Sequence, residues 1–215
     1  VLDFKEKALQ IGEISFDFDG SKGEIIRAAG SLDIAVAGYF LVKGDFAFEK
    51  SSQELTLSDG KKITANALTI SGANVDAFAG INGGTIGEMG LKLQKVDFAL
   101  AMFANSATPS QHWTSLKATA GSVELVGVSD VTISAKTIVV DINLQDAATK
   151  TVVDFKTQNV KVATSLTSSI TLDMDGKAGE IIRAAGSLDI AVAGYFIVKG
   201  DFAFEKSTQE LTLSD

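Results

Sequence analysis

The sequence contains no cysteine, and among its 215 residues there is only one proline (Pro109), one histidine (His112) and one tryptophan (Trp113). Without cysteine there is no disulfide framework, thiol nucleophile or zinc knuckle, so stability has to come from packing and backbone pairing. Proline removes a backbone donor wherever it occurs, so its near absence suits long β-ladders. A lone histidine has no partner for a catalytic triad or a shared metal site. These absences predict a sheet-rich protein that is not an enzyme.

The charge balance is acidic, with 27 aspartates and glutamates against 19 lysines and arginines and a net charge of −8. Nucleic acids and anionic membrane surfaces attract clustered positive charge, so we predict no nucleic-acid partner. No apolar run approaches about 18 residues, which predicts no transmembrane segment, and residues 1–4 lack the charged and apolar regions of a signal peptide. With 46% hydrophobic and 21% charged residues, the chain is expected to fold.

The most informative feature that is present is an internal repeat. Residues 23–59 recur as residues 179–215, at an offset of 156, and only two of the 37 positions differ. The differing pairs are Leu41 with Ile197 and Ser52 with Thr208. A shared fold would leave exposed positions free to differ, so this identity indicates a recent duplication.

The match continues upstream of these segments. Residues 14–20 are in register with residues 170–176, and the first five residues match residues 152–156 at an offset of 151. We therefore predict a repeat of 151 to 156 residues, with residues 1–151 as one full unit and residues 152–215 as part of a second, continuous with the first.

Side chains from Ile26 to Phe48 alternate with the period of a β-strand, with apolar or small residues at even positions and most charged residues at odd ones. One uninterrupted strand of this length would extend about 75 Å at roughly 3.3 Å per residue, so we expect bends or turns at Gly30, Gly38 or Gly44. A three-residue loop at Lys43-Gly44-Asp45 would pair residues 39–42 with residues 46–49 as a hairpin.

Elsewhere the apolar phase slips by one residue within a segment, as happens at a β-bulge or a sharp corner. The slips lie between residues 11 and 14, between 93 and 96, and between 133 and 138. They predict a strongly curved sheet. Residues 67–71 also match residues 130–134 faintly, with Val75 and Ile138 following in register.

Turn sequences favour a meander of hairpins. Asp-Gly pairs at residues 19–20, 59–60 and 175–176 are short hairpin signals, and Asn82-Gly83-Gly84 is a looser one. The least regular stretch is Phe103–Trp113, which we predict to be an exposed loop. His112 is interpreted as a structural or surface residue, and Trp113 as an anchor of this loop, with a role as a contact residue in binding left as the alternative.

Two aspartate pairs resemble the opening of a calcium loop, in which alternate carboxylates converge on one cation. They are Asp17 with Asp19, and Asp173 with Asp175, each followed by a glycine. Neither loop continues with further oxygen ligands, so a turn is favoured and calcium at a repeat junction stays open as the alternative. We assign no catalytic, cofactor-binding or metal-binding residue.

The phenylalanines Phe40, Phe46, Phe48 and Phe98 fall on apolar strand faces. They are expected to pack in the core. If no second layer covers them, the alternative is an apolar groove that carries lipid or another hydrophobic ligand.

Three segments resemble the long tandem repeats of giant bacterial exoproteins and RTX-adhesin-like cell-surface proteins. They are AGSLDIAVAGYFLVKGDFAFEKS (29–51), VDFALAMF (96–103) and HWTSLKATAGSVELVGV (112–128). The resemblance implies a secreted or cell-surface chain of many copies that acts as a spacer, fibre or adhesive stalk. The calcium-binding nonapeptides of that class are absent from this sequence.

Together these features predict an all-β protein: an elongated, curved antiparallel β-sheet or β-solenoid-like architecture built from tandem repeats. The expected role is that of a structural or adhesive segment of a large extracellular protein. The expected partners are neighbouring repeats of the same chain or copies of itself, and other cell-surface or matrix molecules.

Overall fold

The computed structural model describes residues 2–5, 7–16, 20, 23–165 and 168–208. No α-helix occurs in these residues, and a single turn of 3₁₀-helix spans Gly176–Ala178. The strands are β1 (Leu9–Ile11), β2 (Ile14–Phe16), β3 (Ile26–Val36), β4 (Phe40–Thr56), β5 (Lys62–Ile81), β6 (Met89–Asn105), β7 (His112–Val126), β8 (Val131–Leu144), β9 (Val160–Ala163), β10 (Ser169–Leu172), β11 (Ile181–Val192) and β12 (Phe196–Ser207). No described helix is long and apolar enough to cross a membrane.

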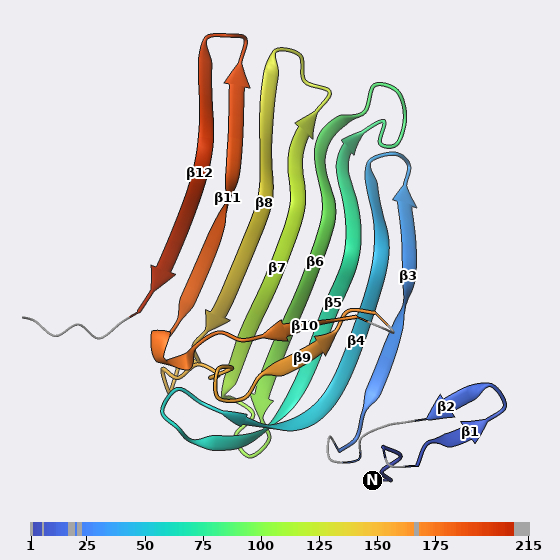
Figure 1. Ribbon diagram of the computed structural model, residues 1–215, viewed down its shortest axis with the longest axis vertical. Helices are drawn as coiled ribbons and strands as arrows, with labels where there is room; N and C mark the ends of the chain where they lie inside the picture. Colours follow the sequence, from blue (N-terminus) through green and yellow to red (C-terminus); the bar gives the residue numbers. More distant parts are fainter. Residues whose placement is uncertain (1, 6, 17–19, 21–22, 166–167, 209–215) are drawn as a thin grey trace, which may run out of the picture.

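Eight of the strands form one antiparallel sheet in the order β12-β11-β8-β7-β6-β5-β4-β3 (Figure 1). Strands β3 to β8 lie in the sheet in chain order, and so do β11 and β12. β8 pairs directly with β11, because the β9–β10 hairpin that separates them in the chain is not part of this sheet. Two further hairpins, β1–β2 and β9–β10, form separate two-stranded sheets. The predicted all-β fold with a large antiparallel sheet is therefore confirmed. The described strands form an open sheet that ends at β3 and β12, and no solenoid coil is seen among them.

The hairpin predicted at Lys43-Gly44-Asp45 is wrong, because β4 runs without interruption through these residues. The turn lies earlier, at Ala37 and Gly38, whose φ angles of 46° and 72° are those of a type I′ turn. The Tyr39 N–H donates to the Val36 carbonyl at 2.8 Å and closes it. The right-handed twist of the two long strands favours this turn even though alanine rarely adopts a positive φ.

Other predicted turns have mixed outcomes. The Asp59-Gly60 hairpin is confirmed: Gly60 has a φ of 82°, and the Leu57 N–H donates to the Lys61 carbonyl at 2.8 Å. Asp175-Gly176 does not form a hairpin, because Asp175 instead caps the 3₁₀ turn by accepting a hydrogen bond from the Lys177 N–H. The Asp19 side of the remaining Asp-Gly pair lies outside the described residues.

Bulges account for two of the three phase slips. Lys95 and Thr137 have φ angles of 53° and 52° in the middle of β6 and β8, where the register with the neighbouring strand shifts. The slip after Ile11 is a two-residue hairpin turn between β1 and β2 rather than a bulge. Figure 1 shows that the sheet is curved, with its strands bent at the end that carries β9 and β10.

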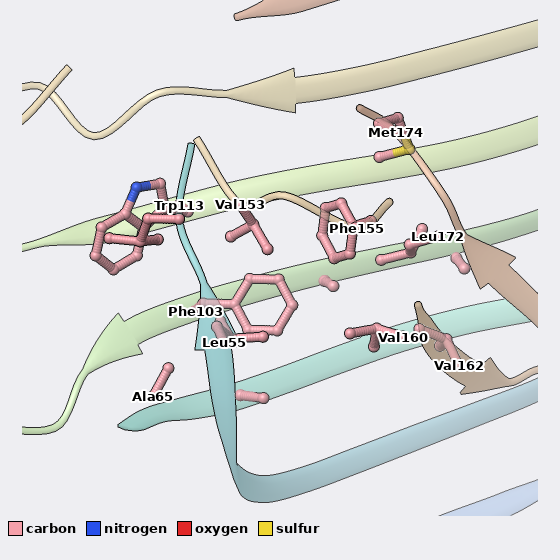
Figure 2. Close-up of a cluster of buried hydrophobic side chains, with 14 residues drawn as sticks. Leu55, Ala65, Phe103, Trp113, Val153, Phe155, Val160, Val162, Leu172 and Met174 are labelled. Atoms are coloured by element: carbon pink, nitrogen blue, oxygen red, sulfur yellow. The ribbon is translucent and has the colours of Figure 1, made fainter. Parts of the chain in front are cut away.

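The hydrophobic core lies between this end of the sheet and the β9–β10 hairpin, which crosses β5, β6 and β7 (Figures 1 and 2). Its buried members are Leu55, Leu57, Ala65, Ala67, Ala99, Ala101, Phe103, Trp113, Val153, Phe155, Val160, Val162, Leu172 and Met174. The four alanines leave room for a second layer to approach the strands, and the large side chains fill the space that remains. Burying each large apolar side chain contributes about 1.5–3 kcal/mol.

The predicted exposed loop is shorter than expected. It spans residues 106–111, because β6 continues to Asn105 and β7 begins at His112. Phe103 and Trp113, which bound the predicted stretch, are 2% and 1% exposed and belong to the core. Trp113 therefore lies where the anchor interpretation places it.

The phenylalanine-rich face is not the face that this core covers. The hairpin lies over odd-numbered positions of β4 such as Leu55, whereas Phe40 and Phe48, at even positions, are 44% and 39% exposed. The expectation that these two rings pack in the core is thus wrong. The reason is parity: successive side chains of a strand point to opposite faces, and the described second layer covers only one.

Candidate functional site: the two edges of the sheet

The two copies of the repeated segment fold into the same hairpin. β3 pairs with β4 and β11 pairs with β12 in the same register, so that Arg27 lies opposite Glu49 and Arg183 lies opposite Glu205. Both arginines form ion pairs with these glutamates, the second at 3.0 Å. Near-identical sequence and identical cross-strand pairing give two equivalent hairpins, one at each edge of the sheet (Figure 1).

A second polar pair recurs in both hairpins. The Ser31 hydroxyl donates to Asp45 in the first, and the Ser187 hydroxyl donates to Asp201 at 2.6 Å in the second. These pairs are exposed and each stabilises the hairpin only slightly. Each hairpin therefore contains the same cross-strand polar contacts.

The two hairpins differ in which of their strands has an outer neighbour. In the first hairpin β4 pairs with β5 and no described strand pairs with the outer edge of β3, whereas in the second β11 pairs with β8 and no described strand pairs with the outer edge of β12. We call these two outer edges the free edges of the sheet. Each copy therefore has the neighbour that the other lacks. Strand edges of 11 and 12 residues without a neighbouring strand are ready templates for another strand.

Side-chain burial follows the same pattern. Ala47 on β4 is 6% exposed beside β5, while its counterpart Ala203 on β12 is exposed. Phe46 packs edge-on against Phe98 of β6, with ring centroids 6.3 Å apart. Its counterpart Phe202 is 38% exposed. The free edge of β12 thus presents apolar groups whose counterparts in the first copy are buried or packed against a neighbouring ring.

The small hairpins β1–β2 and β9–β10 are also counterparts, in line with the upstream sequence match. Val160 and Val162 of β9 are 7% and 2% exposed against the sheet, whereas the matching residues of β1, Leu9 and Ile11, are 44% and 59% exposed. Figure 1 shows β1–β2 away from the large sheet and β9–β10 lying across it. Of these two hairpins, only β9–β10 packs against the large sheet.

In both copies the segment before the small hairpin lies against the glycine that follows that hairpin. Asp154 accepts from the Gly176 N–H at 3.0 Å, and a Cβ on Gly176 would lie 2.6 Å from the Asp154 Cβ. The counterparts Asp3 and Gly20 are equally close, since a Cβ on Gly20 would lie 2.8 Å from the Asp3 Cβ. The hairpin unit therefore keeps its local contacts even where it covers nothing.

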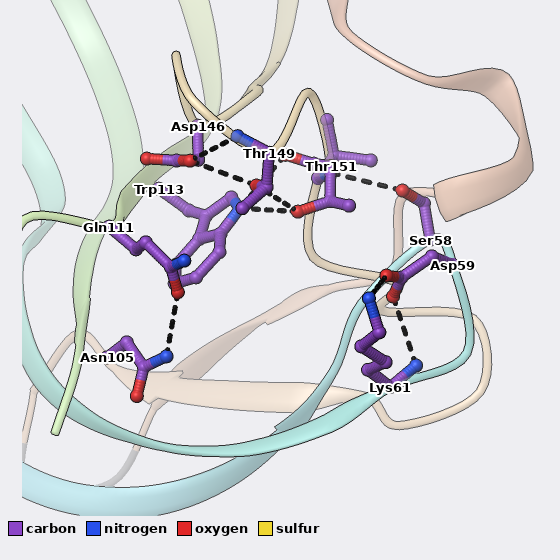
Figure 3. A network of polar contacts seen from close by, with 10 residues as sticks. Ser58, Asp59, Lys61, Asn105, Gln111, Trp113, Asp146, Thr149 and Thr151 are labelled. Atoms are coloured by element: carbon purple, nitrogen blue, oxygen red, sulfur yellow. Dashed lines mark hydrogen bonds and ion pairs between the residues drawn. The ribbon is translucent and has the colours of Figure 1, made fainter. Parts of the chain in front are cut away.

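Buried polar groups hold the loop after β8 against the core (Figure 3). Asp146 is 1% exposed; it accepts hydrogen bonds from the Thr149 N–H and hydroxyl and from the backbone N–H groups of Ala148 and His112. Burial raises the pKa of Asp146, but these hydrogen bonds outweigh burial and lower the pKa overall. Trp113 Nε1 donates to the Thr151 carbonyl at 2.9 Å. This hydrogen-bond network therefore has a structural role: it fixes the loop after β8 against the core.

The residues considered for chemistry from the sequence are not brought together. The exposed His112 contributes its backbone N–H to Asp146, Asp173 pairs with Lys117, and Asp175 pairs with Lys156 at 2.8 Å. That ion pair, first, and the hydrogen bond from Lys177 lower the pKa of Asp175. In the part of the chain that the structure describes, no group of three or more His, Cys, Asp or Glu side chains is placed to hold a metal. Asp17 and Asp19 lie outside that part.

The outer edges of β3 and β12 are thus the two places where the described sheet ends without a neighbouring strand. Comparison with protein-family models, with curated proteins and with solved structures finds no match.

Proposed function

We propose that this chain is a structural segment of a large secreted or cell-surface protein, in which tandem units continue one antiparallel sheet and together act as a spacer, fibre or stalk. The observation that carries the proposal is the pair of equivalent hairpins at opposite edges of the sheet, each with the neighbour that the other lacks. A unit built in this way is extended by a copy of itself.

The position of the small hairpins supports the same role. β9–β10 belongs by sequence to the second unit, yet it covers the strands of the first. β1–β2 has the same sequence phase and exposes its apolar side chains. A preceding unit would give β1–β2 the kind of surface that β9–β10 has, and each unit would then stabilise its neighbour as in a one-dimensional array.

The proposal is tested by the length of the molecule. Because Asp215 matches Asp59, appending residues 60–215 after Asp215 adds one unit in phase. Six strands, β3 to β8, separate equivalent positions in the sheet, so each added unit should lengthen the particle by roughly 29 Å at about 4.8 Å per strand. Small-angle scattering on chains with one and two appended units measures this increment. Units that tumble independently, or a particle that grows equally in all directions, would contradict the role.

A second candidate is a binding module whose apolar sheet face carries lipid. It is favoured by the exposure of Phe40 and Phe48, which no described layer covers. If it is correct, lipid co-purifies with the full chain and the variant Phe48→Ser carries less of it, as measured by mass spectrometry of solvent extracts. A protein free of lipid, with no uptake from added vesicles, excludes this candidate.

Neither role requires a catalytic group. A robust turnover that is lost in the variant His112→Ala would replace both proposals with an enzyme.

A further inference from the structure

Three strands of the large sheet carry a bulge residue with positive φ. These residues are Asn74 in β5, Lys95 in β6 and Thr137 in β8, with φ angles of 49°, 53° and 52°. Two of the backbone N–H groups freed by the bulges are bound by carboxylates across the strand pair. The Asn74 N–H donates to Asp97 at 2.7 Å and the Lys95 N–H donates to Asp76 at 2.8 Å. The bulges are thus stabilised parts of the sheet.

Two of the bulges press against a glycine of the repeated segment. A Cβ on Gly44 of β4 would lie 2.8 Å from the Val75 Cα, next to the β5 bulge. A Cβ on Gly186 of β11 would lie 3.0 Å from the Lys136 carbonyl oxygen, next to the β8 bulge. Neither glycine has a positive φ, so what favours glycine at these positions is the close approach of the bulged strand.

The counterparts of these glycines lie at the free edges. Gly200 of β12 is the counterpart of Gly44, and Gly30 of β3 is the counterpart of Gly186. A Cβ on either would meet no atom within 4 Å. Each free edge therefore keeps a glycine at the position where a bulged neighbour contacts the other copy.

We propose that the outer edge of β12 receives a strand of the β5 type from another unit of the same sequence, with the bulge of that strand lying against Gly200. By the same reasoning, the outer edge of β3 receives a strand of the β8 type against Gly30. The inference rests on the proposed function and adds to it the partner strand and its register.

The pairing of β4 with β5 defines the contacts at the β12 edge. Phe46 lies opposite Gly72, and a Cβ on Gly72 would lie 2.6 Å from the Phe98 ring. An incoming pair of β5-type and β6-type strands places the same glycine opposite Phe202 and the same phenylalanine ring edge-on against it. It covers an aromatic ring that is now 38% exposed.

Charge is matched as well in this register. Lys43 of β4 lies opposite Asp76 of β5. Its counterpart on β12, Lys199, would face the aspartate of the incoming strand. The partner is therefore defined by its chemistry: a long strand with small residues opposite the phenylalanines, a bulge opposite the glycine and a carboxylate opposite the lysine.

The test compares matched glycine variants in the 215-residue chain and in the chain extended by residues 60–215. In the 215-residue chain, Gly200→Ala leaves the urea midpoint of unfolding unchanged or slightly raised, while the control Gly44→Ala lowers it. In the extended chain both substitutions lower the midpoint. Extension also slows hydrogen exchange at least about tenfold for the β12 amides that face the outer edge, because these amides become paired.

Two results would overturn the inference. One is a Gly200→Ala variant that lowers the midpoint of the 215-residue chain as much as Gly44→Ala does. The other is a set of β12 amides that exchange equally fast with and without the extension. If the extended chain lengthens by the expected increment and yet tolerates Gly200→Ala, the units join through another surface, and this inference fails while the proposed function stands. If the chain does not lengthen, the proposed function fails first.

Discussion

The two small hairpins allow a mutational test in which the chain supplies its own control. Val162 of β9 is 2% exposed in the core, and its sequence counterpart in β1, Ile11, is 59% exposed. The variant Val162→Ala removes two buried carbons, which corresponds to about 1.6 kcal/mol of lost transfer free energy, and the unfilled cavity adds to this. We expect a loss of about 2–3 kcal/mol in the free energy of unfolding.

The variant Ile11→Ala removes more carbon than Val162→Ala and should nevertheless change the free energy of unfolding by no more than about 0.5 kcal/mol, because Ile11 is already in contact with water. Urea unfolding followed by tryptophan fluorescence measures both variants. Trp113 is the only tryptophan, is 1% exposed and belongs to the same core as Val162. Equal losses in the two variants, or a larger loss for Ile11→Ala, would refute the assignment of the core to β9–β10 alone.

Three further predictions follow from single contacts. Gly186→Ala should lower the free energy of unfolding by about 1–2 kcal/mol, because its new Cβ meets the β8 backbone, whereas Gly30→Ala should leave it unchanged or raise it by up to about 1 kcal/mol in denaturant titrations. The pKa of Asp146 is lowered on folding, so its stabilisation is complete above the unfolded-state pKa of about 4 and is lost as the pH falls through the folded-state pKa. Thermal unfolding from pH 7 to pH 2 should therefore show a smaller acid-induced loss for Asp146→Asn than for the unchanged chain. Asn143→Leu should cost roughly 2–4 kcal/mol in urea unfolding, because the Val153 carbonyl loses its 2.9 Å donor in a buried site.

The strand content and two of the bulges could be predicted from the sequence because side-chain parity reports directly which face of a strand is buried. The slips around Lys95 and Thr137 are visible as a change from odd to even apolar positions. The bulge at Asn74 leaves no such trace, because small residues surround it and both parities are compatible with them. Its only signal is the faint match of residues 67–71 to residues 130–134, which places Asn74 at the position of Thr137.

The turn after β3 lies at Gly38, one of the three glycines at which the sequence predicts a bend or turn, and Gly44 shows why the sequence could not choose between them. A glycine within an alternating pattern is compatible with a hairpin loop and with the close approach of a neighbouring strand, and local sequence does not distinguish them. The strand that approaches is β5, about thirty residues further along the chain, so the distinction depends on tertiary structure. The turn combines Gly38, which gives a turn signal, with Ala37 at a φ of 46°, a residue type that gives none.

The core crosses the boundary between the two sequence units. Leu55, Phe103 and Trp113 come from residues 1–151, and they are buried by Val153 and Phe155, which begin the second unit. One sheet face of residues 1–151 is therefore covered by the segment that follows these residues in the chain. It is not covered by β1–β2, the hairpin at their own N-terminal end. A stabilising contact made between successive units couples their unfolding, so a chain of such units resists unfolding at its interior more than at its ends. In the role that we propose, each interior unit is therefore supported from both sides.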